Sequence, residues 1–180
     1  MRVAPLSMDD LAGLQEASAE GDLYKLWVTP VPKPEDMAAE ITRRLTLRET
    51  GSMLPFTIYD GEGQVCGQTT YMNIDAKNKR LEIGHTWYAK RVQRTGVNTE
   101  CKFALLTNAF ENLDCIAVEF RTHFMNHASR AAIERLGAKQ DGILRSHMWW
   151  NGTLRDTVVY SIIAAEWPTV KSHLQNKLNS

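Results

Sequence analysis

Residues 81–102 read LEIGHTWYAKRVQRTGVNTECK, and the order of features in this stretch decides the fold. Apolar and polar residues alternate from Leu81 to Trp87, which predicts a strand whose two faces are separated at period two. A polar loop with one central glycine, Gly96, follows, and a helix begins directly after it. Backbone N–H groups that are free at a helix start form a site for an anion. The stretch therefore predicts a strand, a pyrophosphate-binding loop and a helix in direct succession.

The predicted loop is also basic. Lys90, Arg91 and Arg94 add positive charge that can pair with phosphate. The same spacing fits a second interpretation, a solvated strand–helix connection in which the basic residues stand by chance. Neither G-x-G-x-x-G nor G-x-x-x-x-G-K-[ST] occurs in the loop, so a Rossmann or P-loop nucleotide site is disfavoured.

The residues before this stretch predict one strand, two helices and two more strands. The predicted elements are a strand over residues 2–6, helices over 7–21 and 35–51, and strands over 54–59 and 65–74. Ser7 has the properties of a helix N-cap, with Asp10 three residues later. Residues 22–34 contain three prolines, which favours a loop between the two helices.

The residues after the loop continue the alternation of helix and strand. They predict a helix from about residue 99 to 113, a strand over 115–121, a helix over 128–136, strands over 143–150 and 154–163, and a helix over 166–178. Asn151-Gly152 separates the last two strands and is the favoured pair for a type I′ hairpin turn. The order βααβββαβαββα predicts a mixed α/β sheet, with an antiparallel meander followed by a right-handed parallel crossover.

Composition narrows the class of protein. The length of 180 residues suits one domain over 1–180, with 43% apolar and 23% charged residues. A net charge of zero argues against a nucleic-acid partner. No run approaches the roughly 18 apolar residues of a membrane helix, so we expect no membrane partner. Three cysteines without C-x-x-C spacing argue against disulfides and zinc, and we expect a cytoplasmic protein that needs no metal.

Several segments resemble one known family. The segment QRTGVN, from Gln93 to Asn98, is similar to the acyl-CoA signature Q/R-x-x-G-x-G/A of the GCN5-related N-acetyltransferases (GNAT), although Asn98 departs from its last position. The resemblance continues at NHASRAAIERLGA from Asn126, at LRDTVVYS from Leu154 and at EWP from Glu166. It covers nearly the whole chain, and the branch that it resembles is related to the ribosomal-protein N-terminal acetyltransferases.

The resemblance implies a GNAT fold that binds acetyl-CoA as cosubstrate in a splay between the fourth and fifth strands. The backbone of Trp87 and Tyr88 would bind the pantetheine arm, and Asn126 would contact the same arm. Ser129 would lie near the sulfur and donate a proton to the departing thiolate. The loop residues that would hold the pyrophosphate are Gln93, Arg94, Thr95, Gly96, Val97, Asn98 and Thr99.

The implied reaction is direct attack of a primary amine on the thioester. Deprotonating an α-amine of pKa about 8 costs only about 1.4 kcal/mol at pH 7, against about 4.6 kcal/mol for a lysine-type amine. Glu82 is the candidate base, and the alternatives for it are a solvent-facing strand carboxylate or an ion pair with an arginine. His85 and His123 are secondary candidates. Tyr88 and Tyr160 could replace Ser129 as the acid.

The acceptor remains open between a small amine and a peptide α-amine. In some ribosomal-protein acetyltransferases a glutamate in the penultimate strand serves as the general base. This chain has Met148 at about that place, and the departure argues against ribosomal-protein acetylation. Trp27, Tyr71 and Trp149 either line an acceptor pocket or serve packing. A second function is a non-catalytic acyl-CoA-binding sensor or assembly module. Either function is compatible with a monomer or a homodimer.

Overall fold

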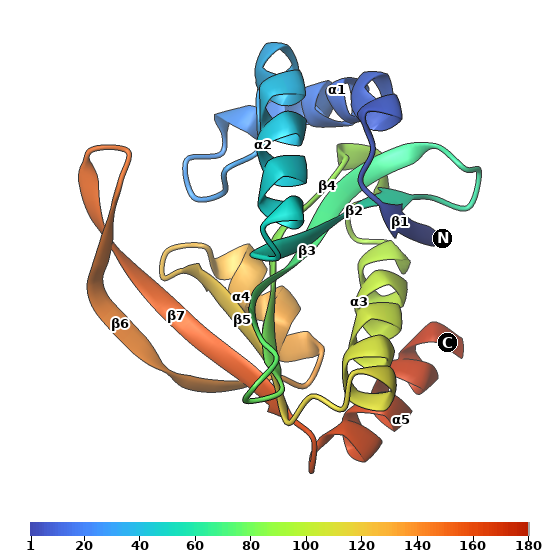
Figure 1. Cartoon of the computed structure of the whole chain (residues 1–180), viewed down its shortest axis with the longest axis vertical. Coiled ribbons are helices and arrows are strands. Elements are labelled where there is room, and N and C mark those ends of the chain that lie inside the picture. Colours follow the sequence, from blue (N-terminus) through green and yellow to red (C-terminus); the bar gives the residue numbers. More distant parts are fainter. Residues whose placement is uncertain (180) are drawn as a thin grey trace. The chain divides into compact units, whose positions relative to one another are not determined.

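The computed structural model describes residues 1–179. Over that range the chain forms seven strands and five α-helices in the order βααβββαβαββα, so the predicted order is confirmed (Figure 1). The strands are β1 (Arg2–Pro5), β2 (Met53–Tyr59), β3 (Val65–Asp75), β4 (Arg80–Tyr88), β5 (Ala117–His123), β6 (Lys139–Trp150) and β7 (Thr153–Ile163). The helices are α1 (Leu11–Ala19), α2 (Met37–Glu49), α3 (Val97–Thr107), α4 (His127–Arg135) and α5 (Trp167–Asn179).

The sheet is mixed, as predicted. Its strand order is β1-β2-β3-β4-β5-β7-β6. The pairs β1/β2, β2/β3, β5/β7 and β6/β7 are antiparallel, whereas β4 and β5 pair in parallel over Arg80–Glu82 and Ala117–Glu119. The predicted parallel crossover through α3 is therefore present.

The chain divides into two compact units. The first unit comprises Met1–Ile74 and Ile83–Cys101, and the second comprises Asp75–Glu82 with the chain from Lys102 onward. A single domain over 1–180 stays a prediction, and each unit is described separately below.

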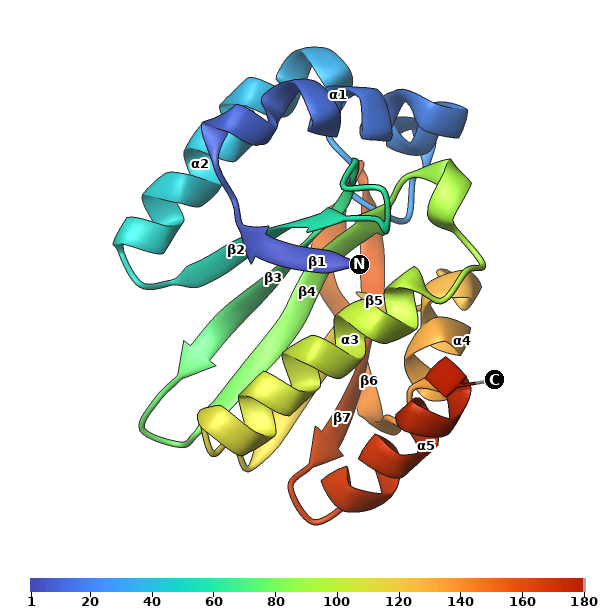
Figure 2. The ribbon, with the colours of Figure 1, turned by 90° about the vertical axis from the view of Figure 1, so that its right-hand side faces the viewer.

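In the first unit, the residues that lead into α1 are bound to β2. Ser7 and Asp10 form the predicted capping box. The Asp10 carboxylate is buried, and it accepts hydrogen bonds from the Thr57 hydroxyl at 2.7 Å and from the Tyr59 hydroxyl. These contacts tie the start of the helical segment to β2. The helices α1 and α2 lie next to each other in both views (Figure 1; Figure 2).

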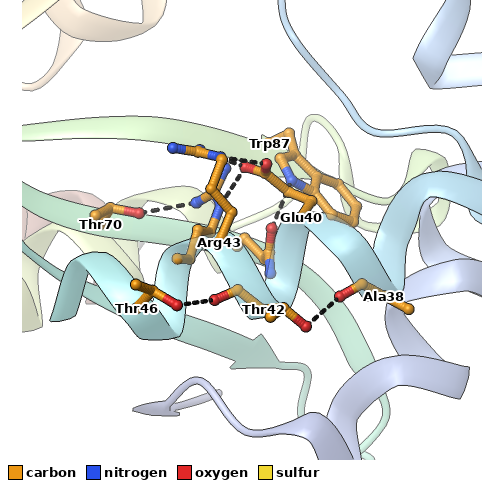
Figure 3. A network of polar contacts seen from close by, with 9 residues as sticks. Ala38, Glu40, Thr42, Arg43, Thr46, Thr70 and Trp87 are labelled. Carbon is orange, nitrogen blue, oxygen red and sulfur yellow. Dashed lines mark hydrogen bonds and ion pairs between the residues drawn. The ribbon is translucent and has the colours of Figure 1, made fainter. Parts of the chain in front are cut away.

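A buried arginine joins α2 to β3 in the same unit. Arg44 donates from Nε to Glu40 Oε1 at 2.7 Å and from Nη1 to Thr70 Oγ1 at 3.0 Å. Figure 3 shows the Glu40 carboxylate beside Arg43, with Thr70 on the neighbouring strand. Burial alone would raise the pKa of Glu40, but the hydrogen bonds and charges of Arg43 and Arg44 lower it to about 2. The carboxylate is therefore ionised throughout the neutral range.

The strands β3 and β4 approach very closely at Gly67. A Cβ atom at this position would lie 2.2 Å from the carbonyl oxygen of Trp87, so any larger residue requires backbone movement. The next two residues of β3 also bind β4. Gln68 Oε1 accepts a hydrogen bond from Trp87 Nε1 at 3.3 Å, and the hydroxyls of Thr69 and Thr86 lie 2.8 Å apart. The C-terminal end of β4 is thereby fixed to β3.

The predicted period-two alternation along β4 is wrong in its middle. Leu81 is buried as expected, but its neighbour Glu82 is also buried, with 5% of its surface exposed. His85 has a positive φ of 48°, outside the extended region, so the alternation of faces is interrupted there. A sequence pattern of period two assumes uniform extended backbone, and β4 does not have it.

In the second unit, β7 pairs with β5 on one side and with β6 on the other. Phe120 and Tyr160 are paired across β5 and β7 and are buried. The Tyr160 hydroxyl donates to Glu134 Oε1 of α4 at 2.7 Å and accepts from Arg130 Nε at 3.1 Å, so α4 covers this face. Asn151 and Gly152 have φ values of 46° and 79°, which confirms the predicted type I′ turn.

The strand β6 differs from the prediction by beginning at Lys139 rather than near residue 143. Its register against β7 shifts between Leu144 and Met148. Asp156 of β7 holds this bulge, because its carboxylate accepts hydrogen bonds from Arg145 Nε at 2.6 Å and from the Ser146 N–H at 2.7 Å. A second register shift lies between Gln140 and Gly142, at the start of the strand. A bulge there interrupts the period-two signal, which explains the misplaced start.

We predict that Gly67→Ala destabilises the protein by about 1–3 kcal/mol or more, because the added methyl group collides with the Trp87 carbonyl. Urea unfolding followed by circular dichroism measures the change. Gly61→Ala is the matched control, since no atom lies within 4 Å of its added Cβ, and it should change the stability by less than about 0.5 kcal/mol. Equal stabilities for the two variants would contradict the close approach.

Candidate functional site

The predicted phosphate loop lies in the first unit and has an open helix start. A short 3₁₀ turn over Lys90–Val92 leads into it, and Arg94 adopts a positive φ of 64°. The first helical hydrogen bond of α3 runs from the Glu100 N–H to the Gly96 carbonyl at 2.9 Å. Within residues 1–179, the N–H groups of Asn98 and Thr99 consequently have no carbonyl acceptor in the helix. Their dipoles and the helix axis favour an anion at this end.

Side chains of the loop hold its shape. Gln93 Nε2 donates to the carbonyl of Tyr88 at 2.9 Å and ties the loop to the end of β4. The Thr95 hydroxyl donates to the Val92 carbonyl at 2.6 Å and accepts from the Val97 N–H at 3.3 Å. Gln93 and Thr95 thus stabilise the loop through their side chains. Any anion binding at this helix start falls mainly to backbone N–H groups.

Gly96 is not required by the fold itself. A Cβ atom at this position would meet nothing nearer than Glu100 Oε1, at 3.6 Å, which is ordinary contact. Its φ is outside the positive range that favours glycine. The absence of a side chain leaves the helix start open to a ligand.

One of the three basic loop residues does not fit its predicted role. We expected Arg91 to pair with phosphate, but its guanidinium forms ion pairs with Glu20 and with Asp60, the latter at 3.1 Å. It also donates to the Val65 carbonyl at 2.8 Å. These partners come from three other segments of the first unit, and sequence spacing could not reveal them. Lys90 and Arg94 are exposed.

Trp87 and Tyr88 end the strand that precedes the loop. The Trp87 side chain is buried, with 5% of its surface exposed, so its ring belongs to the core of the first unit. Burial raises the pKa of Tyr88 well above its ordinary value, and the neighbouring Cys101 acts in the same direction. A buried phenol whose proton is held so firmly is a poor general acid, which disfavours Tyr88 for that role.

Glu82 lies in the second unit beside arginine. Its Oε2 is 3.7 Å from Arg121 Nε, and the same nitrogen lies 2.5 Å from Glu119 Oε1. Glu82 and Glu119 are partners in the parallel register of β4 and β5. Of the two alternatives to a catalytic base, the solvent-facing carboxylate is excluded by burial and the arginine pair is present.

The two histidine candidates lie in different units. His123 is buried in the second unit, and its Nδ1 accepts a hydrogen bond from the Met125 N–H at 3.0 Å. The neutral ring therefore carries its proton on Nε2. Burial lowers the pKa of His123, and the positive charge of Arg155 lowers it further. With Nδ1 occupied, His123 is suited to donate a hydrogen bond rather than to accept a proton. His85 is half-buried in the first unit.

Asn126 and Ser129 form the start of α4. Asn126 Oδ1 accepts a hydrogen bond from the Ser129 N–H at 3.0 Å, so the asparagine is the N-cap of this helix. Ser129 is half-buried, and among residues 1–179 no partner is bound by its hydroxyl. The Tyr160 hydroxyl, by contrast, is engaged by Arg130 and Glu134, so Ser129 is the more available proton donor.

The three aromatic residues that were candidates for an acceptor pocket, Trp27, Tyr71 and Trp149, differ in how far their side chains are buried. Tyr71 is buried and packs edge-on against Phe56 with ring centroids 5.4 Å apart, which supports the packing interpretation. Trp27 and Trp149 are mostly exposed.

In the described part of the chain, no group of three His, Cys, Asp or Glu side chains is placed to hold a metal ion. No helix among residues 1–179 is long and apolar enough to cross a bilayer.

The sequence analysis missed one charged residue of the second unit. Arg155 of β7 is half-buried, and Glu82 is close enough for its charge to act on this arginine. The signal available was the alternation of Arg155 and Thr157 along a strand whose other face, apart from Asp156, carries Leu154, Val158, Tyr160 and Ile162. An arginine at an inward position of such a strand indicates a function or a buried ion pair.

Comparisons with known proteins agree with this fold. The profile of the acetyltransferase (GNAT) domain matches residues 1–139. YdaF of Bacillus subtilis (strain 168), provisionally named a ribosomal N-acetyltransferase, is 36% identical over 110 residues, which is 61% of this chain and 58% of that protein. The chain thus matches little more than half the length of this curated relative.

Solved structures extend the likeness to nearly the whole chain. A GCN5-related N-acetyltransferase from Brucella melitensis is 29% identical with a TM-score of 0.88, over 97% of this chain and 80% of that chain. RimJ of Mycobacterium smegmatis, solved in complex with CoA-disulfide, is 22% identical with a TM-score of 0.81, over 97% of this chain and 88% of that chain. The second likeness supports the fold alone. With the family profile covering residues 1–139 and the predicted order of elements present, the chain belongs to the GNAT family of acetyltransferases.

Proposed function

We propose that the protein transfers an acetyl group from acetyl-CoA to a primary amine. The observation that carries this proposal is the open start of α3, where Asn98 and Thr99 offer N–H groups beside a glycine that the fold does not need. Family membership and the N-acetyltransferase names of the relatives support it.

The loop would hold the cosubstrate by its phosphates. N–H groups from Arg94 to Thr99, except that of Val97, which donates to the Thr95 hydroxyl, would donate to the pyrophosphate oxygens. The exposed Lys90 and Arg94 would add charge. Gln93 and Thr95 would act indirectly, by keeping the loop in shape. The end of β4 at Trp87 and Tyr88 would offer backbone groups to the pantetheine, and Asn126 would contact the same arm.

The proposed chemistry is a single displacement at the thioester carbonyl. The amine nitrogen forms a bond to the acetyl carbon, and the bond from that carbon to sulfur breaks. The proton released by the amine passes through water to the Glu82 carboxylate. The thiolate takes a proton from the Ser129 hydroxyl, which solvent then restores. In its ionised form the Glu82 carboxylate offers the oxygen lone pairs that accept this proton.

Two observations bear on which amine is the acceptor. The provisional name of YdaF supports a protein N-terminus, whereas Met148 argues against ribosomal proteins as acceptors. An α-amine fits a modest base better than a lysine does, since its deprotonation costs about 3 kcal/mol less at pH 7.

A sensor that binds acyl-CoA without turnover is the alternative. The ion pair between Glu82 and Arg121 favours the sensor, because a carboxylate that pairs with an arginine can serve the fold without acting as a base. The release of free CoA thiol from acetyl-CoA, measured over a panel of α-amines, separates the two functions. Amine-dependent release supports the enzyme, and binding of acetyl-CoA without release supports the sensor.

We predict that Gly96→Asp weakens CoA binding by tenfold or more, about 1.4 kcal/mol, because it adds a negative charge beside the phosphates. The fold has room for the new Cβ, so the thermal midpoint should hardly change. Isothermal calorimetry with CoA gives the affinity. Gly61→Asp adds the same charge at an open position of the first unit and serves as control. Wild-type affinity in Gly96→Asp would rule out the phosphate loop.

Ser129→Ala should lower kcat with little change in the KM for acetyl-CoA, because the hydroxyl acts only on the departing thiolate. Asn126→Ser keeps a capping oxygen but loses the amide, so it should raise this KM more than it lowers kcat. Steady-state kinetics with acetyl-CoA as the varied substrate measures both. Full turnover in Ser129→Ala would move the acid role to another group.

Glu82→Gln preserves the shape of the side chain and removes its basicity. We expect kcat/KM to fall by about 10² to 10⁴ at pH 7, and the loss to shrink as the pH approaches the pKa of the amine. Glu119→Gln is the matched control, since Glu119 pairs with the same Arg121 and faces Glu82 in the register. If the pH profiles of Glu82→Gln and the wild type coincide, Glu82 is a structural partner of Arg121.

A further inference from the structure

One sheet face of the second unit carries a continuous row of polar side chains. Glu82 of β4 is paired with Glu119 of β5, and Arg121 and His123 follow on the same face of β5 at period two. His123 is paired in turn with Thr157 of β7. Arg155 stands two residues before Thr157 and therefore belongs to the same face. We call these residues the polar row: Glu82, Glu119, Arg121, His123, Thr157 and Arg155.

The two arginines of the polar row differ in their partners. Arg121 lies within 4 Å of two carboxylates, those of Glu119 and Glu82. Arg155 is half-buried, yet among residues 1–179 no carboxylate lies within 4 Å of its guanidinium. Burial lowers the pKa of Arg155, and the more distant charge of Glu82 raises it only in part. A partly desolvated guanidinium without an anion is a candidate for binding one.

Neighbouring groups fix the orientation of Arg155. Its Nε donates to the Thr157 hydroxyl oxygen at 3.1 Å, and its Cζ lies 5.2 Å from the centre of the Trp150 ring. His147 Nδ1 lies 3.1 Å from the same hydroxyl oxygen. With Nε occupied, the two terminal nitrogens remain for a ligand, and they form the planar fork that binds a carboxylate in two-point fashion.

The adjacent carboxylate does not serve as that ligand. Asp156 follows Arg155 directly in β7, so the two side chains point to opposite faces of the sheet. Its oxygens accept hydrogen bonds from Arg145 and from the backbone of Ser146, in the bulge of β6. Asp156 is thus engaged by β6, and its carboxylate is not the partner of the two terminal nitrogens of Arg155.

We propose that Arg155 binds a carboxylate carried by the amine acceptor. The inference rests on the proposed acetyl transfer and narrows its substrate to amines that also bear a carboxylate. The polar row presents the carboxylate of Glu82 at one end and the guanidinium of Arg155 at the other. An acceptor with an amine and a carboxylate complements both charges. Free amino acids and peptides with an acidic side chain near the N-terminus share this chemistry.

The test uses two pairs of acceptors in which one member has a carboxylate and the other an amide. Because amidation also lowers the pKa of the α-amine of alanine, kcat/KM is compared per neutral amine. Alanine and alaninamide form the small pair, and the peptide amides Ser-Asp-Ala and Ser-Asn-Ala form the peptide pair. We expect the wild type to prefer the carboxylate member of one pair by tenfold or more in kcat/KM, because the hydrogen bonds of a guanidinium to a carboxylate are charge-assisted. The pair that shows the preference identifies the source of the carboxylate.

Variants assign the preference to Arg155. Arg155→Gln should abolish it, and Arg155→Lys, which keeps the charge and loses the fork, should retain part of it. Arg145→Gln is the matched control, because Arg145 is an exposed arginine of the same hairpin and pairs with Asp156. It should keep the full preference. Thermal midpoints show whether each variant is folded.

Binding is measured independently of turnover through the side-chain Nε–H signal of Arg155 in NMR, which is assigned by its absence in Arg155→Lys. A shift of this signal with the carboxylate member only, together with the kinetic preference, supports the proposal. Equal kcat/KM within both pairs, or a preference that survives in Arg155→Gln, overturns it, as does an unmoved signal with all four compounds. If the signal moves but no acetyl group is transferred, the anion site stands and the proposed acetyl transfer fails.

Discussion

An α-helix cannot satisfy the N–H groups of its own first turn, and this constraint determines what the first unit can do. In α3 the ladder begins only at Glu100, and the N–H groups of Asn98 and Thr99 remain for another acceptor. In many helices a capping side chain accepts a hydrogen bond from one of these N–H groups, as Asn126 does in α4. At α3 the Thr95 hydroxyl accepts a hydrogen bond from the Val97 N–H only, and the residue before the helix is Gly96, so the N–H groups of Asn98 and Thr99 stay open. The other features of the first unit serve to present this open start.

The loop is held in place before any ligand arrives. Gly67 allows β3 to meet the Trp87 carbonyl, and Gln93 ties the loop to the carbonyl of Tyr88. Arg91 joins the loop to Glu20 and Asp60, far away in the sequence. Binding an anion then costs little ordering entropy, because the backbone donors already have their positions. In this view Arg91 contributes to binding through position, although its charge suggested a direct contact.

Local patterns predicted the elements well and the contacts poorly. Alternation and helical periodicity gave the order βααβββαβαββα, and single residues such as Ser7 and the pair Asn151-Gly152 gave a cap and a turn. These signals act over a few residues. The burial of Glu82 beside Arg121 and the anchoring of Arg91 depend on segments far apart in the chain, which no spacing encodes. The bulge that shifts β6 against β7 is invisible for the same reason, since it depends on Asp156 of the other strand.

The first unit carries a backbone anion site, and the second unit carries a charged sheet face. The free N–H groups at the start of α3 are proposed to bind the phosphates of CoA, and backbone NMR during a titration with CoA tests this binding directly. We expect the amide signals of Gly96, Asn98 and Thr99 to shift with CoA and to stay unmoved with pantetheine, which has no phosphate. Amide signals that ignore CoA, or that move equally with pantetheine, would contradict it.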